Sequence, residues 1–130
     1  MEIEIKAKVK DFRKIKTRLK KIGAKKIDQQ NQLDNYYLPF GCHFSKKGRR
    51  LLRTRYDKKS KKMRLEAHRY QDNLSGHEFE TEVTDKKMIE KILAELKFKK
   101  VVTVEKNRQT YKFKNTKIVL DKVKNLGNFI

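Results

Sequence analysis

This chain contains an internal repeat: a shift of 74 positions aligns its N-terminal part, from Glu4 onward, with a later part that begins at Glu78. In both parts, a stretch of alternating residues precedes an acidic residue suited to a helix N-cap, a helical apolar stripe and a basic return segment. The repeat predicts two strand–helix–strand units and an α+β fold with a pseudo-twofold axis. The aligned pairs are Glu4 and Glu78, Val9 and Val83, Asp11 and Asp85, Ile15 and Ile89, Leu19 and Leu93, and Ile22 and Leu96.

The N-terminal stretch Met1–Val9 alternates as a β-strand does. Glu2, Glu4 and Lys6 share one face, and apolar residues share the other. Same-face neighbours on a strand lie about 6.5–7 Å apart, so two carboxylates could serve one hydrated divalent cation. The ammonium of Lys6 could hold an anion against that cation. A solvated polar face on an edge strand is the alternative.

The remaining periodicities predict two helices and a series of strands. Asp11 and Asp85 are the expected helix N-caps, and Gly23 is expected in the left-handed conformation that ends the first helix. Residues 24–38 are expected to be extended, and Phe40–Gly48 to form a loop. The later expected strands are Arg50–Tyr56, Lys62–Tyr70, His77–Val83, Lys99–Lys106, Gln109–Lys114 and Thr116–Val123.

Charged residues gather on single faces of several of these strands. Two amphipathic helices could cover the apolar strand faces, leaving the charged faces inside a closed antiparallel barrel. Acids and bases buried together need partners, and a metal–triphosphate complex would satisfy both signs. A sheet with a solvated polar face remains the alternative. The charged positions are Arg53 and Arg55, Glu78 and Glu80, Lys106 and Arg108, and Asp121.

Composition limits the partners and the setting. The 130 residues are expected to form one domain, residues 1–130, and carry a net charge of +20, which points to a polyanionic partner such as a nucleotide, polyphosphate or nucleic acid. No apolar run approaches the roughly 20 residues of a membrane span, so no membrane insertion is expected. The single cysteine excludes an internal disulfide and is consistent with a reducing, cytoplasmic setting.

Six motifs in order make the chain resemble the CYTH superfamily of triphosphate tunnel metalloenzymes. This superfamily includes class IV adenylyl cyclases, thiamine triphosphatases and inorganic triphosphatases. The ending of the last motif, followed by Asn128-Phe129-Ile130, is most similar to the class IV cyclases. The motifs are Glu2-Ile3-Glu4-Ile5-Lys6, Asp34-Asn35-Tyr36-Tyr37, Leu52-Arg53-Thr54-Arg55, Glu78-Phe79-Glu80, Val104-Glu105-Lys106-Asn107-Arg108 and Leu120-Asp121-Lys122-Val123-Lys124-Asn125-Leu126-Gly127.

The resemblance implies a Mg²⁺- or Mn²⁺-dependent enzyme that converts ATP to cyclic AMP and pyrophosphate. An inorganic or thiamine triphosphatase is the alternative, and a non-catalytic binder of RNA or polyphosphate is the alternative of another class. A homodimer is compatible with the resemblance. The implied metal ligands are Glu2, Glu4, Asp121, Glu78 and Glu80; the implied phosphate-binding residues are Lys6, Arg53, Arg55, Arg69, Lys106 and Arg108, of which Lys6 and Arg108 are the implied catalytic residues.

The chain departs from the family pattern in two places. Where the family carries T-x-K on its fourth strand, this chain has Glu66-Ala67-His68-Arg69, so Arg69 is the expected substitute and His68 the less favoured one. The family continues beyond its L-G-x-F motif with an E-x-E strand, whereas this sequence stops at Ile130. Two alternatives follow: the sequence is a truncated product, or the metal site is weakened and the barrel is less completely closed at its C-terminal side.

Overall fold

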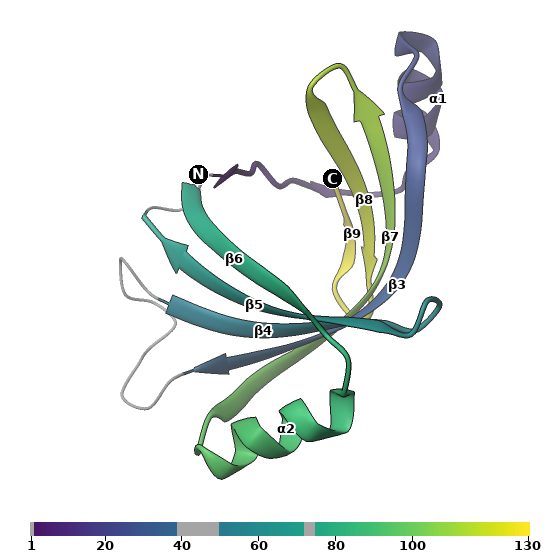
Figure 1. The fold of residues 1–130 in the computed structure, drawn as a ribbon. Coiled ribbons are helices and arrows are strands. Elements are labelled where there is room, and N and C mark those ends of the chain that lie inside the picture. The colour runs from purple at the N-terminus through teal and green to yellow at the C-terminus, as the bar shows by residue number, and fades with distance from the viewer. Residues whose placement is uncertain (1, 39–49, 72–74) are drawn as a thin grey trace. The chain divides into compact units, whose positions relative to one another are not determined.

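The computed structural model describes residues 2–38, 50–71 and 75–130, which form a mostly antiparallel sheet with two helices (Figure 1). The expected loop Phe40–Gly48 lies outside these residues. The helices are α1 (Arg13–Ile22) and α2 (Lys86–Glu95). The strands are β1 (Glu2–Ile3), β2 (Lys8–Val9), β3 (Lys25–Leu38), β4 (Arg50–Asp57), β5 (Lys62–Tyr70), β6 (Ser75–Val83), β7 (Lys99–Phe113), β8 (Thr116–Val123) and β9 (Gly127–Phe129).

The chain separates into two compact units. The first unit comprises Met1–Ile5 with Leu33–Val104, and the second comprises Lys6–Gln32 with Glu105–Ile130. The strand order is β1-β6-β5-β4-β3-β7 in the first unit and β3-β7-β8-β9-β2 in the second, because the long strands β3 and β7 contribute to both.

Both units contain the strand–helix–strand order that the sequence repeat predicts. β2 ends at Val9 and β6 at Val83, while β3 begins at Lys25 and β7 at Lys99, and each of these pairs is 74 positions apart. The two buried leucines of the helices, Leu19 and Leu93, obey the same shift.

The helix ends agree with the sequence in two of three cases. Asp85 is the N-cap of α2, and its Oδ1 accepts a hydrogen bond from the amide of Met88 at 2.9 Å. Gly23 ends α1 with φ +82°, as expected. The assignment of Asp11 as an N-cap is wrong: the N-cap of α1 is Phe12, while the Asp11 carboxylate accepts from the amide of Arg13.

Three expected strands differ from the structure. The continuous strand Met1–Val9 is instead divided into β1 and β2, with Glu4–Ala7 between them, and Ile3 and Ile5 are 71% and 78% exposed. Without a partner for its apolar face, alternation alone does not maintain one long strand. In the C-terminal part, β7 is a single strand where two were expected.

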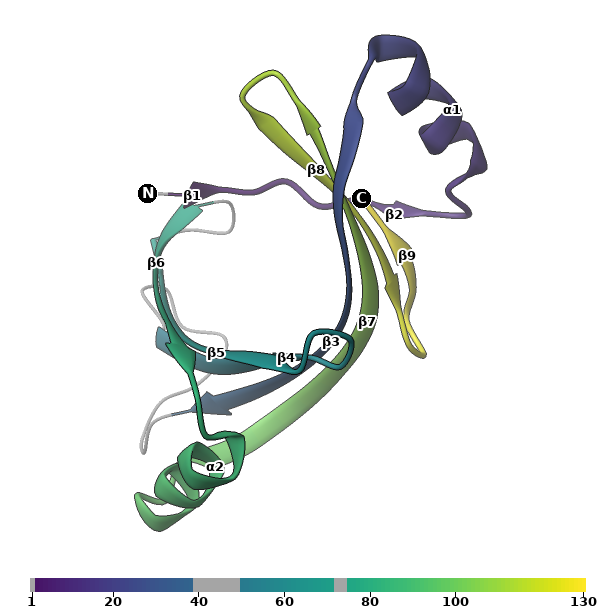
Figure 2. The same ribbon diagram turned by 45° about the vertical axis from the view of Figure 1, so that its right-hand side comes forward.

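In the first unit, α2 lies alongside the N-terminal part of β7 (Figure 2). Lys86 of α2 lies over the ring of Tyr56, 5.3 Å from its centroid, and β-strand alternation places Tyr56 on the other side from Arg55. The helix therefore covers the less charged face, as the barrel hypothesis expects. Closure is not observed: among the described residues, β1 pairs with β6 and β2 with β9, and these end strands do not pair with each other.

The cap of α2 gives a test of this fold. Asp85→Ala is expected to lower the free energy of unfolding by about 1 kcal/mol, because the amide of Met88 loses its acceptor. Asp85→Asn keeps an acceptor and is expected to stay within a few tenths of a kcal/mol of the wild type. Urea denaturation measures both. Equal losses in the two variants would contradict the capping role.

Candidate functional site

Charged residues of β4 and β5 are buried in the first unit: Arg53, Arg55 and Glu66, with His68 and Glu78 half-buried beside them. Antiparallel pairing sets Arg53 opposite Glu66 and His68 opposite Glu78. Since side chains alternate along a strand, Glu66 and His68 share one face of β5, and Arg53 and Arg55 share one face of β4. The described residues bury more polar and charged side chains than apolar ones. Such an interior is stable only where the charges are paired.

Arg53 is held by several groups at once. Its Nε and Nη2 donate to the two carboxylate oxygens of Glu66 at 2.8 and 3.0 Å, and its Nη1 donates to the Tyr36 hydroxyl at 3.2 Å. Nη2 also lies 3.5 Å from an oxygen of Glu78. A planar guanidinium bound in this bidentate way has a fixed direction, unlike a surface arginine.

Arg55 forms a second bidentate pair on the same face. Its Nε and Nη2 donate to the carboxylate of Asp34 on β3 at 2.8 and 2.7 Å, and both residues are buried. The face therefore holds two oriented guanidinium groups on alternate residues of β4, each against a carboxylate from a neighbouring strand.

The pKa values of this cluster follow from those contacts. Burial by itself raises the pKa of Glu66, but hydrogen bonds with Arg53 and Glu78 and the charges of Arg53 and Arg55 outweigh it, and the pKa falls to about 2. For Arg53, burial lowers the pKa, but the bond to Glu66 and nearby negative groups raise it above its ordinary value. Both members of the pair are therefore charged at neutral pH.

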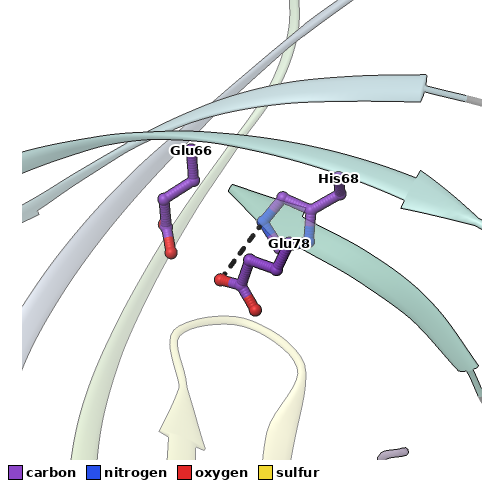
Figure 3. Close-up of side chains that lie close together, drawn as sticks. All are labelled: Glu66, His68 and Glu78. Carbon is purple, nitrogen blue, oxygen red and sulfur yellow. Dashed lines mark ion pairs between the residues drawn. The ribbon is translucent and has the colours of Figure 1, made fainter. Parts of the chain in front are cut away.

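Beside this pair, Glu66, His68 and Glu78 gather three groups that can bind a metal ion (Figure 3). One ligand atom from each residue lies within 4.8 Å of the other two, and His68 Nε2 lies 3.6 Å from Glu78 Oε1. Two carboxylates with an imidazole are a donor set suited to a divalent transition metal. Arg53 contacts both glutamates, so a cation bound there would compete with the guanidinium.

In the second unit, Arg108 and Asp121 form a pair of the same kind. Arg108 Nε and Nη2 each donate to the Asp121 carboxylate at 2.8 Å across the β7–β8 pairing. Burial raises the pKa of Asp121, but the bond to Arg108 and the charges of Arg108, Lys106 and Lys6 lower it below the ordinary value. Three cations near one carboxylate leave a local positive excess suited to an anion.

The structure distributes the residues predicted for the site among several environments. Arg53, Arg55 and Glu78 lie in the buried cluster of the first unit, and Lys106, Arg108 and Asp121 lie on β7 and β8 of the second. Glu80 is exposed and 3.7 Å from Arg64, while Glu4 and Lys6 are exposed between β1 and β2. Glu2 belongs to β1.

Arg69, the expected substitute on the fourth strand, is not brought to the cluster. It is exposed and, by alternation, on the opposite face of β5 from His68. His68, the less favoured alternative, is the one beside Glu66 and Glu78.

Three residues that bind Arg53 or Arg55 are not among the site residues predicted from the sequence: Asp34, Tyr36 and Glu66. The alternation of β5 places Glu66 on the same face as His68, so its position near the site could be predicted. Its pairing with Arg53 could not, because that depends on the β4–β5 register.

Comparison with known proteins identifies the family. The CYTH domain model matches residues 1–130. The chain belongs to the CYTH domain family. It is 30% identical over 132 residues to a protein of Methanocaldococcus jannaschii named "Putative adenylate cyclase", covering 100% of this chain and 74% of that protein.

Solved structures agree on the fold. The PH1012 protein of Pyrococcus horikoshii OT3 is 32% identical with a TM-score of 0.87, over 99% of this chain and 75% of that one. A structure from Vibrio parahaemolyticus, titled as a "putative adenylate cyclase", is 17% identical with a TM-score of 0.78, over 98% and 73% of the chains, and supports the fold alone. No helix in the described part of the CYTH chain has the length and hydropathy to cross a membrane.

The Arg53–Glu66 pair gives the second test. Glu66→Leu is expected to lower the free energy of unfolding by about 3 kcal/mol or more, because it leaves the buried guanidinium without its bidentate partner. The double variant Arg53→Met/Glu66→Leu is expected to recover much of that loss. As a control, Glu90→Gln breaks the exposed pair with Lys86 and should change stability by less than about 0.5 kcal/mol. A double variant as unstable as the single one would contradict this account.

Proposed function

We propose that this CYTH protein is a metal-dependent enzyme acting on a triphosphate substrate, with class IV adenylyl cyclase-like activity. The observation that carries the proposal is the burial of arginines and acids together on the strand face of the first unit. A structural sheet has no need of so many buried charges, since apolar residues of similar size are often at least as stable. A substrate with several phosphoryl groups gives these charges a use, and the cyclase names among the relatives support it.

The proposed work of the cations is electrostatic. Phosphoryl and nucleotidyl transfer depend mainly on in-line positioning and on neutralising charge that develops on the leaving group. Arg53 and Arg55 present planar forks suited to phosphoryl oxygens. Lys6, Lys106 and Arg108 supply positive charge around Asp121, and Lys6 and Arg108 are proposed to contact the reacting phosphoryl groups. The carboxylate partners of Arg53, Arg55 and Arg108 fix the directions of these guanidinium groups before any substrate binds.

The donor set of the cluster fits a divalent cation, and its composition favours Mn²⁺ over Mg²⁺. Glu66 is ionised at neutral pH and Glu78 adds a second carboxyl group, which suits either ion, whereas the imidazole of His68 suits the transition metal better. When bound, such an ion neutralises phosphoryl charge and orients the substrate. Glu2, Glu4, Glu80 and Asp121 remain predicted metal ligands.

The proposed reaction converts ATP to cyclic AMP and pyrophosphate, which together contain the three phosphorus atoms of ATP. The ribose 3′-oxygen forms a bond to the α-phosphorus of ATP as the bond from the α-phosphorus to the bridging oxygen of the β-phosphate breaks. The 3′-hydroxyl proton is lost, and pyrophosphate leaves. In a triphosphatase, water attacks the terminal phosphorus as the bond from that phosphorus to its bridging oxygen breaks, so the terminal group becomes inorganic phosphate and the diphosphate remainder is the leaving group. The same residues are proposed to bind the triphosphate in both reactions. The product therefore shows whether the nucleophile is the ribose 3′-oxygen or water.

Turnover is the direct test. With ATP and Mn²⁺, the protein is expected to form cyclic AMP and pyrophosphate in equal amounts, and Lys6→Gln is expected to lower kcat/KM by roughly 100-fold through loss of a positive charge at the reacting phosphoryl groups. Lys10→Gln, an exposed lysine from the same segment, is the control and should stay within about twofold. Phosphate released from inorganic triphosphate, without cyclic AMP, would replace the cyclase by a triphosphatase. No turnover of either ATP or inorganic triphosphate would contradict the proposal.

The metal ligands have a test that does not depend on turnover. Mn²⁺ binding, followed by the loss of the free-ion electron paramagnetic resonance signal, is expected to weaken by roughly 10- to 100-fold in His68→Gln. Arg69→Gln is the matched control, because it alters the next residue on the opposite face of β5 and should leave binding unchanged. Equal affinity in His68→Gln and the wild type would remove His68 from the site.

A further inference from the structure

Positive charge is unevenly divided between the two units. The second unit holds 18 of the 36 Lys and Arg residues but only four of the 16 Asp and Glu residues, in fewer than half of the 130 positions. Most of the net charge of +20 therefore belongs to that unit. The triphosphate proposal accounts for Lys6, Lys106 and Arg108 and leaves the rest unexplained.

Much of the remainder lies on α1. Six of its ten residues are Lys or Arg, none is acidic, and all six are exposed. Among the ion pairs of the described residues, one involves this helix, between Arg13 and Asp11 at 3.4 Å. The exposed Lys25 and Lys26 follow at the start of β3. We name these eight residues the α1 basic face: Arg13, Lys14, Lys16, Arg18, Lys20, Lys21, Lys25 and Lys26.

Helix α2 shows that the fold does not require this charge. It occupies the same place in the repeat, yet it carries three lysines and two glutamates, and Lys86 pairs with Glu90 at 2.8 Å. On α1, Lys14 and Arg18 are like charges four residues apart, which destabilises a helix. Cations in the first turn also oppose the helix dipole, whereas Lys20 and Lys21 in the last turn agree with it. The first-turn charges therefore oppose helix stability.

We propose that the α1 basic face binds the phosphate backbone of a duplex nucleic acid without reading its sequence. An anionic membrane fits less well, because interfacial helices need a wide free apolar face: on α1, Leu19 is buried and Ile15 half-buried, which leaves Ile22 as the one exposed apolar residue of this helix. Single strands are typically held by stacking on aromatic side chains, and helix α1 (Arg13–Ile22) contains no aromatic residue. A row of exposed cations suits backbone contacts, whose affinity falls steeply with salt.

The test compares two double variants, one on each helix, that each remove two exposed cations four residues apart. Fluorescence anisotropy with a labelled 20-base-pair duplex, as RNA and as DNA, measures affinity from 50 to 300 mM KCl. Lys14→Gln/Arg18→Gln is expected to flatten the slope of log affinity against log salt by about 1.8, which at 0.1 M salt corresponds to roughly 60-fold weaker binding. Lys87→Gln/Lys91→Gln removes the same charge from α2 and should leave slope and affinity near those of the wild type.

Every outcome bears on the proposal. Selective loss in the α1 variant with either duplex supports it. Equal loss in both variants, no loss in the α1 variant, or α1-dependent binding to inorganic polyphosphate or phosphatidylserine vesicles without duplex binding would overturn it. Circular dichroism checks that α1 persists, and Lys16→Gln/Lys20→Gln provides a second α1 variant should the first unfold. Triphosphate turnover measured in parallel is expected to be unchanged, so this proposal and the enzymatic one fail separately.

Discussion

Bidentate pairing between arginine and carboxylate is the interaction on which the interior of both units depends. Arg53 with Glu66, Arg55 with Asp34 and Arg108 with Asp121 each join neighbouring strands through two hydrogen bonds. Burying such groups costs the free energy of their hydration. That cost is offset only if each charge meets its partner in good geometry. The charged strand faces are therefore stable as a set of pairs and not as separate residues.

Pairing of this kind also makes the strand register matter more than in an apolar core. A slip of one residue between β4 and β5 would move Glu66 to the opposite face and leave Arg53 without its carboxylate. The turn between these strands fixes the register. Asp57 accepts hydrogen bonds from the amides of Lys59 and Ser60 and from the Ser60 hydroxyl, and Lys61 adopts φ +61°. The turn thus determines the pairing of Arg53 with Glu66, which are 13 residues apart in the sequence.

These same facts decide what the sequence could reveal. Alternation was enough to place Arg53 and Arg55 on one face, and the repeat was enough to locate both helices, because these signals are local. The partner of Arg53 and the position of His68, and not Arg69, beside Glu66 and Glu78 could not be predicted, since both depend on the strand register and on which face of β5 carries the cluster. The split of the N-terminal stretch was missed for a related reason. Its alternating pattern specified two faces, but not whether Ile3 and Ile5 would find anything to pack against.

The repeat lets the chain serve as its own reference. Positions that agree between the copies, such as Leu19 with Leu93, are what a strand–helix–strand unit needs in order to pack. Positions that disagree are free of that requirement, so their chemistry reflects other demands. By this criterion the buried leucines of the helices belong to the fold, whereas the cations of α1 do not, because α2 has Met88, Glu90 and Ile92 where α1 has Lys14, Lys16 and Arg18. The two copies thus separate the charge needed for folding from the charge available for binding.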